Sequence, residues 1–201
     1  MVFTDAMKAV AQKELSDKLK SRWVVVIAAG FALFTVVISY FSGATSGVAG
    51  LRSMDATIAS LTSLVTYFIP ILALTLGGGI IADERDKGTL ELYLSSPMSI
   101  GEFITGKFLG LAVALVLSTT AGLGIACIVI IIKLGFSTVL TYLLFVLNSV
   151  FLGLIFLSVS FLVSILFSDR ARVIAFTIFL WLFFAVLYDL GLVGLLIITK
   201  G

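Results

Sequence analysis

Long apolar runs constrain this chain more than any other feature of its sequence. A bilayer core about 30 Å thick requires roughly 20 apolar residues in one helix, and the 201 residues contain five such runs. Hydrophobic residues make up 61% of the chain and charged residues only 12%, against about 25% charged in soluble domains. The runs are Trp23–Phe41, Leu61–Ala82, Phe108–Ile132, Thr138–Phe167 and Val173–Thr199. We therefore predict an all-α, polytopic integral membrane protein with five transmembrane helices in one domain over residues 1–201.

Lysine and arginine are distributed unevenly among the connections between these runs. Of the 13 basic residues, five precede the first run, three lie between the second and third, and two lie between the fourth and fifth. The remaining three are Arg52, Lys133 and Lys200. Because cytoplasmic connections hold the excess of basic residues, we expect a cytoplasmic amino terminus and an outside carboxyl terminus in a cell (inner) membrane. The net charge of +2 follows from this topology and indicates no nucleic-acid partner.

The amino-terminal arm, residues 1–22, has a helical spacing of apolar residues. Phe3, Met7, Val10, Ala11, Leu15 and Leu19 recur at intervals of three and four, with lysines between them. This pattern predicts an amphipathic helix lying in the cytoplasmic interface of the bilayer. A solvated basic tail that only sets the topology is the alternative.

The segment from residue 83 to 107 is the only long polar stretch between two apolar runs. It carries eight of the 24 charged residues. Asp83 can cap a helix with Glu84 and Asp86 in its first turn, and Pro97 can stop that helix. Ser99 and Glu102 then have the spacing of a capping box for the next helix. We expect a short amphipathic helix on the cytoplasmic surface, rather than an ordinary solvated loop.

Two groups of small residues concern helix packing. A small residue recurs at every fourth position from Gly106 onward, which would allow another helix to approach closely; the strip comprises Gly106, Gly110, Ala114, Ser118, Gly122 and Ala126. The second run contains Pro70 and then Gly77, Gly78 and Gly79, where the helix can bend. The bend is either a hinge connected to the segment 83–107 or simply a place of tight packing.

Few polar residues lie inside the predicted spans. Asn148 can form a hydrogen bond with a neighbouring helix. An intramembrane carboxylate is a functional-site hypothesis by default, but counting from Val173 at about 1.5 Å per residue places Asp189 near the outer interface. Anchoring at that interface and a role in transport are the two alternatives for Asp189.

No pattern in the sequence predicts a catalytic or metal site. The chain has no His and a single Cys, Cys127, so neither a Ser-His nor a Cys-His pair can form, nor a His- or Cys-rich metal site within one chain. The stretch from Gly101 to Lys107 fits a phosphate-binding loop except that Phe108 replaces the Ser or Thr that would hold magnesium. We therefore expect no catalytic residue, no metal and no cofactor on this chain.

The segment 83–107 resembles the cytoplasmic coupling segment of ABC-2 type transporter permeases. The similar residues are Glu84, Arg85, Gly88, Thr89, Leu90, Glu91, Leu94, Pro97 and Ser99, followed by Gly106 and Lys107. The opening from Lys13 to Trp23 is also similar, and Asp169 to Arg172, Trp181 and Tyr188 to Leu190 resemble the NosY-like branch, which is linked to maturation of multicopper enzymes.

This resemblance implies a homodimeric or paired permease driven by a separate cytoplasmic ABC ATPase. The partner ATPase would bind ATP and magnesium, and the helix from Glu84 to Leu94 would contact it. Permeases of this family have six spans, so one span has no counterpart among the five runs. The missing His, and the lack of any Met inside a run, do not favour copper as the transported species. The alternative function is a non-transporting membrane anchor or assembly scaffold derived from a permease.

Overall fold

The computed structural model describes residues 5–41, 54–88, 98–134 and 139–200, and the regular structure of these residues is entirely helical. In chain order the elements are α1 (Asp5–Lys20), α2 (Trp23–Phe41), α3 (Met54–Gly77), α4 (Ile80–Asp86), α6 (Ile100–Leu134), α7 (Val139–Leu166), α8 (Arg170–Leu182), the π-helix η3 (Phe183–Leu187) and α9 (Tyr188–Lys200). The prediction of an all-α membrane protein is confirmed.

Four helices of the described residues are long and apolar enough to cross a membrane. They are Leu61–Asp86, Ile100–Ile125, Val139–Leu166 and Arg170–Leu187. The first predicted run coincides with α2, a helix of 19 residues, of which the stretch Val24–Phe34 is the part whose side chains are described without a gap. The described residues therefore support four of the five predicted spans at this length, and the remaining predicted span coincides with α2.

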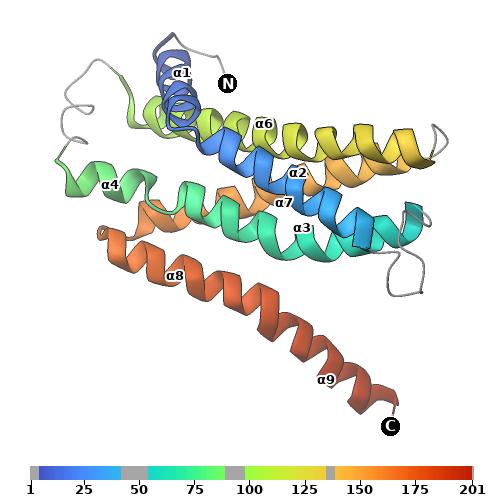
Figure 1. Cartoon of the computed structure of the whole chain (residues 1–201). Helices are drawn as coiled ribbons and strands as arrows, with labels where there is room; N and C mark the ends of the chain where they lie inside the picture. The colour runs from blue at the N-terminus through green and yellow to red at the C-terminus, as the bar shows by residue number, and fades with distance from the viewer. Residues whose placement is uncertain (1–4, 42–53, 89–97, 135–138, 201) are drawn as a thin grey trace.

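The helices α2, α3, α6 and α7 form a bundle, and α8 with α9 lies on one side of it (Figure 1). The helix α1 crosses the beginning of α6, and α4 lies at the same end of the bundle. We call this end, with α1, α4 and the first turns of α6 and α8, the charged end. The helix α9 extends away from the bundle, and Ile197 and Ile198 on it are exposed. The most extensive packing joins α3 to α7, and α1 and α2 to α6.

Two clusters of buried side chains hold the bundle together. One joins α2, α3, α6 and α7 toward the end opposite the charged end, where the Tyr142 hydroxyl donates a hydrogen bond to the Leu123 carbonyl oxygen at 2.8 Å. The other lies nearer the charged end and includes Leu76, Phe103 and Phe161. Because the apolar runs pack against one another on one face only, large side chains such as Leu140 and Ile155 stay exposed on the other, as expected for helices that face lipid.

The chain turns between α1 and α2 at Arg22, whose φ of 58° is in the left-handed region. The Arg22 N–H donates to the Leu19 carbonyl oxygen at 3.1 Å, so α1 ends and the chain changes direction. The predicted helix in the arm is confirmed as α1. Its apolar face is shorter than predicted, because Met7 is buried whereas Leu19 is exposed.

The predicted start of the coupling helix is wrong. Asp83 lies inside α4, which begins at Ile80 after Gly79 and has no side-chain cap. The helix ends at Asp86, and Gly88 follows with a φ of 68°, a conformation that commonly terminates helices because glycine adopts it without a Cβ clash. The helix therefore does not run on from Glu84 in the way that the sequence predicted.

Candidate functional site

Lys107 is buried at the charged end between carboxylates from two other helices. Its ammonium Nζ lies 2.8 Å from Oε1 of Glu84 in α4 and 3.1 Å from Oε2 of Glu14 in α1. Only 5% of Lys107 is exposed, and its Nζ also lies 5.4 Å from the centre of the Phe103 ring. We call Lys107, Glu14 and Glu84 the Lys107 junction. It joins the amino-terminal arm, the predicted coupling segment and a membrane helix through one ammonium group.

Burial makes each charge of this junction depend on its partners. A buried ammonium is stable in its charged form only when opposite charges compensate for lost hydration, and both carboxylates are themselves largely covered, with side-chain exposures of 12% for Glu14 and 19% for Glu84. Sequence analysis assigned Lys107 to the end of the coupling motif and to a failed phosphate-binding loop. In the structure, residues 101–108 are helical within α6, so no such loop forms.

A second set of contacts fixes α4 against the beginning of α8. Arg170 Nε lies 3.2 Å from Oδ1 of Asp83, and the Arg170 backbone N–H donates to Oδ2 of Asp86 at 3.4 Å. Arg85 donates from Nη1 to the carbonyl oxygen of Phe167 at 3.3 Å. Asp169 caps α8 by accepting a hydrogen bond from the Ala171 N–H at 2.9 Å. The helix α4 is therefore tied to α1, α6 and α8 and to the residues that precede α8.

The break between α3 and α4 is joined to α7 by two serines. The Ser160 hydroxyl donates to the Leu74 carbonyl oxygen at 2.6 Å. The Ser164 Oγ accepts hydrogen bonds from the backbone N–H of Ile81 at 3.0 Å and of Ala82 at 3.3 Å. Both serines are fully buried. Ser164 provides an acceptor for first-turn N–H groups of α4, which have no partner within their own helix. Ser160 adds a second donor to the Leu74 carbonyl oxygen, which also accepts from the Gly78 N–H at 2.9 Å. Sequence analysis missed them, although two serines four residues apart in an apolar run indicate a polar stripe on one helix face.

The predicted hinge residues lie at this break. Pro70 is inside α3, and Gly78 and Gly79 form the turn between α3 and α4. A Cβ on Gly78 would lie 2.6 Å from the Leu74 carbonyl oxygen, and one on Gly77 would lie 3.0 Å from Ser160 Oγ. Gly78 is therefore required by the backbone of the preceding turn of α3, and Gly77 by the close approach of α7. Whether the break also moves stays a prediction.

The strip of small residues on α6 packs against the first two helices. A Cβ on Gly106 would lie 2.8 Å from the Met7 carbonyl oxygen, and one on Gly110 would lie 2.7 Å from that of Ala11. Further along, Gly122 meets α2, with a built Cβ 2.7 Å from the Ala28 carbonyl oxygen. Ala114 and Ser118 of the strip are fully buried, and the side chain of Ala126 lies outside the described part. The strip thus holds α1 and α2 at backbone distance from α6.

The structure describes only some of the other predicted site residues. Glu84, Arg85 and Gly88 are described, whereas Thr89, Leu90, Glu91, Leu94 and Pro97 lie outside the described residues. The predicted capping box at the start of α6 is confirmed, because the Ser99 N–H donates to Glu102 Oε2 at 2.8 Å and the Glu102 N–H donates to Ser99 Oγ at 3.2 Å. Asp189 belongs to the first turn of α9, and its side chain lies outside the described part.

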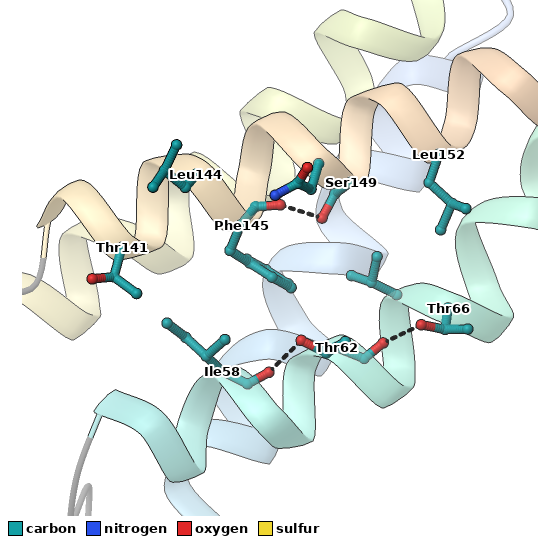
Figure 2. A pocket seen from close by; sticks show the side chains of 10 residues that line it. Ile58, Thr62, Thr66, Thr141, Leu144, Phe145, Ser149 and Leu152 are labelled. Carbon is teal, nitrogen blue, oxygen red and sulfur yellow. Dashed lines mark hydrogen bonds between the residues drawn. The ribbon is translucent and has the colours of Figure 1, made fainter.

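A pocket of about 450 Å³ lies between α3 and α7, far from the charged end (Figure 2). Its polar side chains include Thr62, Thr66, Asn148 and Ser149. Three of the hydroxyl groups are occupied within their own helices: Thr62 donates to the Ile58 carbonyl oxygen at 2.8 Å, Thr66 to that of Thr62 at 2.8 Å, and Ser149 to that of Phe145 at 2.7 Å. Asn148 is exposed on α7. The pocket is mostly apolar with one uncommitted amide.

A polar contact joins the aromatic end of α8 to α3. Trp181 Nε1 donates a hydrogen bond to the Tyr67 carbonyl oxygen at 3.0 Å. Tyr67 precedes Pro70 by three residues, so the contact joins α8 to the turn of α3 that leads into the proline. Among the described residues no group of three or more His, Cys, Asp or Glu side chains is placed to hold a metal ion.

Comparisons with known proteins place this geometry in a family. Residues 8–201 match the family described as "ABC-2 family transporter protein". A protein of Pseudomonas aeruginosa named "Probable ABC transporter permease protein NosY" is 37% identical over 201 aligned positions, which cover 96% of this chain and 71% of that protein. A protein of the same name from Stutzerimonas stutzeri is 34% identical over 197 positions, with the same two coverages.

Proposed function

This chain belongs to the ABC-2 family of transporter proteins, and on that premise we propose that it is a permease subunit driven by a separate cytoplasmic ABC ATPase. The permease role follows from the family match over residues 8–201 and from helices that can cross a membrane. ATP and magnesium would be bound by the partner, and this chain would hold no nucleotide of its own. A substrate would cross the membrane through the permease when the ATPase changes shape.

The Lys107 junction is the observation that carries the coupling part of this proposal. A force applied to α4 must reach the membrane helices to be useful. Glu84 on α4 is bound to Lys107 on α6, and the same ammonium is bound to Glu14 on α1. Because a buried ion pair resists separation, α4, α1 and α6 should move as one unit when a partner presses on the segment that begins at α4.

The break at Gly78 supplies the complementary element. It separates α3 from α4, and backbone groups on its two sides are bound to Ser160 and Ser164 of α7. A helix interrupted in this way can change its direction without unfolding. We propose that α4 tilts about this break, and that α7 follows through its serines. The movement would then reach α3, α6 and α7.

The charged end faces the cytoplasm in this proposal. Most of the lysine and arginine residues lie in the arm, in the segment 83–107 and before α8, and basic residues are retained on the cytoplasmic side. A homodimeric or paired permease would place two such ends beside two ATPase subunits. The exposed apolar faces of α8 and α9 leave room for a second permease or for lipid.

A link to multicopper enzyme maturation is proposed from the NosY-like residues alone. Both similar proteins are named as permeases, and their names state no substrate. The chain has no His, and its Met residues are Met1, Met7, Met54 and Met98, so the described spans offer no row of ligands that would suit copper. We propose a cargo other than a copper ion.

The competing proposal is a membrane anchor or assembly scaffold derived from a permease. It would retain the bundle and the packing strip but would need no ATPase. The property that separates the two proposals most directly is retention of an ABC ATPase by the charged end. A neighbouring reading frame that encodes an ATPase with a phosphate-binding loop would favour the transporter.

Co-purification tests the coupling proposal directly. The chain is expressed with the ATPase encoded beside it, and the retained ATPase is compared for Glu84→Ala, Arg85→Ala and Leu90→Ala. Helix-in-groove contacts concentrate their energy in a few anchors, so loss of the Arg85 or Leu90 side chain should weaken the complex by about 1 to 3 kcal/mol, or roughly five- to a hundredfold. Glu84→Ala would instead act on the complex through the Lys107 junction, because the Glu84 carboxylate is bound to Lys107. Substitutions at Arg52 and Asp55, in the connection predicted to lie outside, serve as controls. Equal weakening by the controls, or no retained ATPase with the unmodified chain, contradicts the proposal.

A further inference from the structure

A second cavity, of about 360 Å³, lies at the charged end between the α3–α4 break and α8. Lys18 of α1, Asp83 of α4 and Arg170 of α8 contribute the charged part of its lining. Leu74, Ile174 and Ile178 contribute apolar wall. The cavity therefore combines a charged rim with a hydrocarbon surface, and it is distinct from the Lys107 junction, none of whose three residues lines it.

The charged and apolar parts of the cavity lie at different depths. Arg170 is the first residue of α8, and Ile174 and Ile178 follow one and two turns later. At about 1.5 Å per residue they lie roughly 6 and 12 Å farther along the helix axis. Both isoleucines are exposed, at 43% and 50%, so the wall is open to the surrounding hydrocarbon. This order, charge at the end of the span and apolar surface deeper, is the order of a phospholipid headgroup and its acyl chain.

The rim carries more positive than negative charge. Arg170 directs Nε to Asp83 Oδ1 at 3.2 Å, but this oxygen is buried without a hydrogen-bond donor, and a guanidinium group has further N–H donors on its other nitrogens. Lys18 Nζ lies 3.9 Å from Glu14 Oε1, and the other oxygen of Glu14 is bound to Lys107. Two cations, Lys18 and Arg170, thus share the rim with one carboxylate, Asp83, which is ion-paired with Arg170.

We infer that this cavity binds one anionic glycerophospholipid from the leaflet at the charged end. The phosphodiester would lie between Lys18 and Arg170, and one acyl chain would follow Leu74, Ile174 and Ile178. Basic pockets between membrane helices bind anionic headgroups for this electrostatic reason. The inference goes beyond transport, since it concerns a bound lipid and needs neither the ATPase nor a substrate. A lipid seated there would contact both sides of the α3–α4 break.

Trp181 provides a reporter for this lipid. It lies eleven residues after Arg170 on α8, or about 16 Å along the helix, which is the depth of an acyl chain. The chain has two tryptophans, so a Trp23→Phe background leaves Trp181 alone. This full-length protein is placed in phosphatidylcholine nanodiscs that contain a small, equal fraction of brominated phosphatidylglycerol or brominated phosphatidylcholine. Bromine quenches tryptophan fluorescence on contact. Quenching of Trp181 as a function of the fraction of each brominated lipid therefore reports whether the site prefers phosphatidylglycerol to phosphatidylcholine.

We expect brominated phosphatidylglycerol to quench Trp181 at a lower fraction than brominated phosphatidylcholine. A basic side chain near the surface contributes about 1 kcal/mol to anionic lipid binding, so Lys18→Gln and Arg170→Gln should each reduce the preference about fivefold. Lys18→Arg and Arg170→Lys keep the charge and should keep most of the preference. Asp83→Asn should increase it, because the competing carboxylate is removed.

Arg172→Gln is the matched control, because it removes the same charge from the same helix two residues away at a position that does not line the cavity. Identical quenching by the two brominated lipids overturns the inference. So does an equal loss of preference in Arg172→Gln and Arg170→Gln. Excess inorganic phosphate, compared with chloride at equal ionic strength, should leave the preference unchanged; displacement of the lipid by phosphate would assign the rim to a water-soluble anion instead.

Discussion

Lys107 contacts Glu84 at 2.8 Å across 23 residues of sequence, and this pair connects the segment that resembles a coupling element to the membrane helix that follows it. The contact is shielded from water, because Lys107 is buried and Glu84 is largely covered. The pair therefore joins α4 to α6 through a contact that excludes most water. Glu14 adds the amino-terminal arm to the same connection at 3.1 Å.

Replacing Lys107 with Met should lower stability more than replacing either carboxylate partner. Removing one member of a fully buried ion pair costs about 3 to 5 kcal/mol, and the residual exposure of Glu14 and Glu84 reduces this to an expected loss of about 1 to 3 kcal/mol. Glu14→Gln leaves Lys107 with Glu84 and should cost less. Thermal unfolding in detergent measures both. The double variant Lys107→Met/Glu14→Gln should lose less stability than the two single variants lose together. Strict additivity of the two losses would show that Lys107 and Glu14 make no stabilising contact.

Gly78→Ala should be destabilising even though alanine favours helices. A Cβ at this position would lie 2.6 Å from the Leu74 carbonyl oxygen and 3.2 Å from Thr177 Cγ2, so the chain must shift at a cost of about 1 to 3 kcal/mol. Gly124→Ala is the control, because a Cβ there meets no atom within 4 Å. It should raise stability by about 0.5 to 1 kcal/mol. Equal effects of the two substitutions on thermal unfolding would contradict the packing at the break.

Ser164→Ala should weaken the attachment of α4 to α7. It would leave the Ile81 and Ala82 N–H groups without the acceptor that they share, and a buried donor without a partner costs about 1 to 3 kcal/mol. Ser158→Ala on the same helix removes only a hydroxyl that is exposed and bound to the Leu154 carbonyl oxygen, and it should change stability by less than about 0.5 kcal/mol. Amide hydrogen exchange of residues 80–86 should rise in the first variant only.

Gly110→Leu should release α1 from α6. A Cβ at Gly110 would lie 2.7 Å from both the Ala11 carbonyl oxygen and Glu14 Cβ, so a leucine side chain cannot fit beneath α1. Gly101→Leu places the same side chain on α6 where nothing lies within 4 Å. Trypsin cleavage at the lysines of α1 should accelerate about five- to a hundredfold for Gly110→Leu if the contact loses about 1 to 3 kcal/mol. Similar cleavage of both variants would show that α1 is not held by this contact.

Cysteine labelling tests the orientation that the basic residues predict. Single cysteines at Ser46 and Ser95, in a background with Cys127→Ala, should react from opposite sides of the membrane. An impermeant maleimide added outside intact cells should label position 46, whereas position 95 should need permeabilised cells. Labelling of both positions from outside would overturn the cytoplasmic placement of the segment 83–107. The proposed lipid would then lie in the outer leaflet, and the charged end would lie on the side opposite to a cytoplasmic ATPase.

The sequence determined the helices themselves, because helix formation in a membrane depends on local composition. Apolar runs of about 20 residues must hydrogen-bond internally in hydrocarbon, so their positions could be predicted without tertiary contacts. The capping box of Ser99 and Glu102 could also be predicted, since its partners are three residues apart. The coupling helix was placed less well, because Asp83 and the glycines before it allow either a new helix or a continuation of α3.

Only the tertiary structure decided what the polar side chains contact. Lys107 meets Glu14 across 93 residues and Ser164 meets Ile81 across 83, and no local pattern in a single sequence specifies such pairs. Asp83 provides the clearest case: its sequence context indicates a helix cap, yet the approach of α8 gives it Arg170 as its ionic partner. Local backbone energetics select each helix, whereas burial at the charged end selects the partner of each charge, because a charge withdrawn from water needs the nearest compensating group in space.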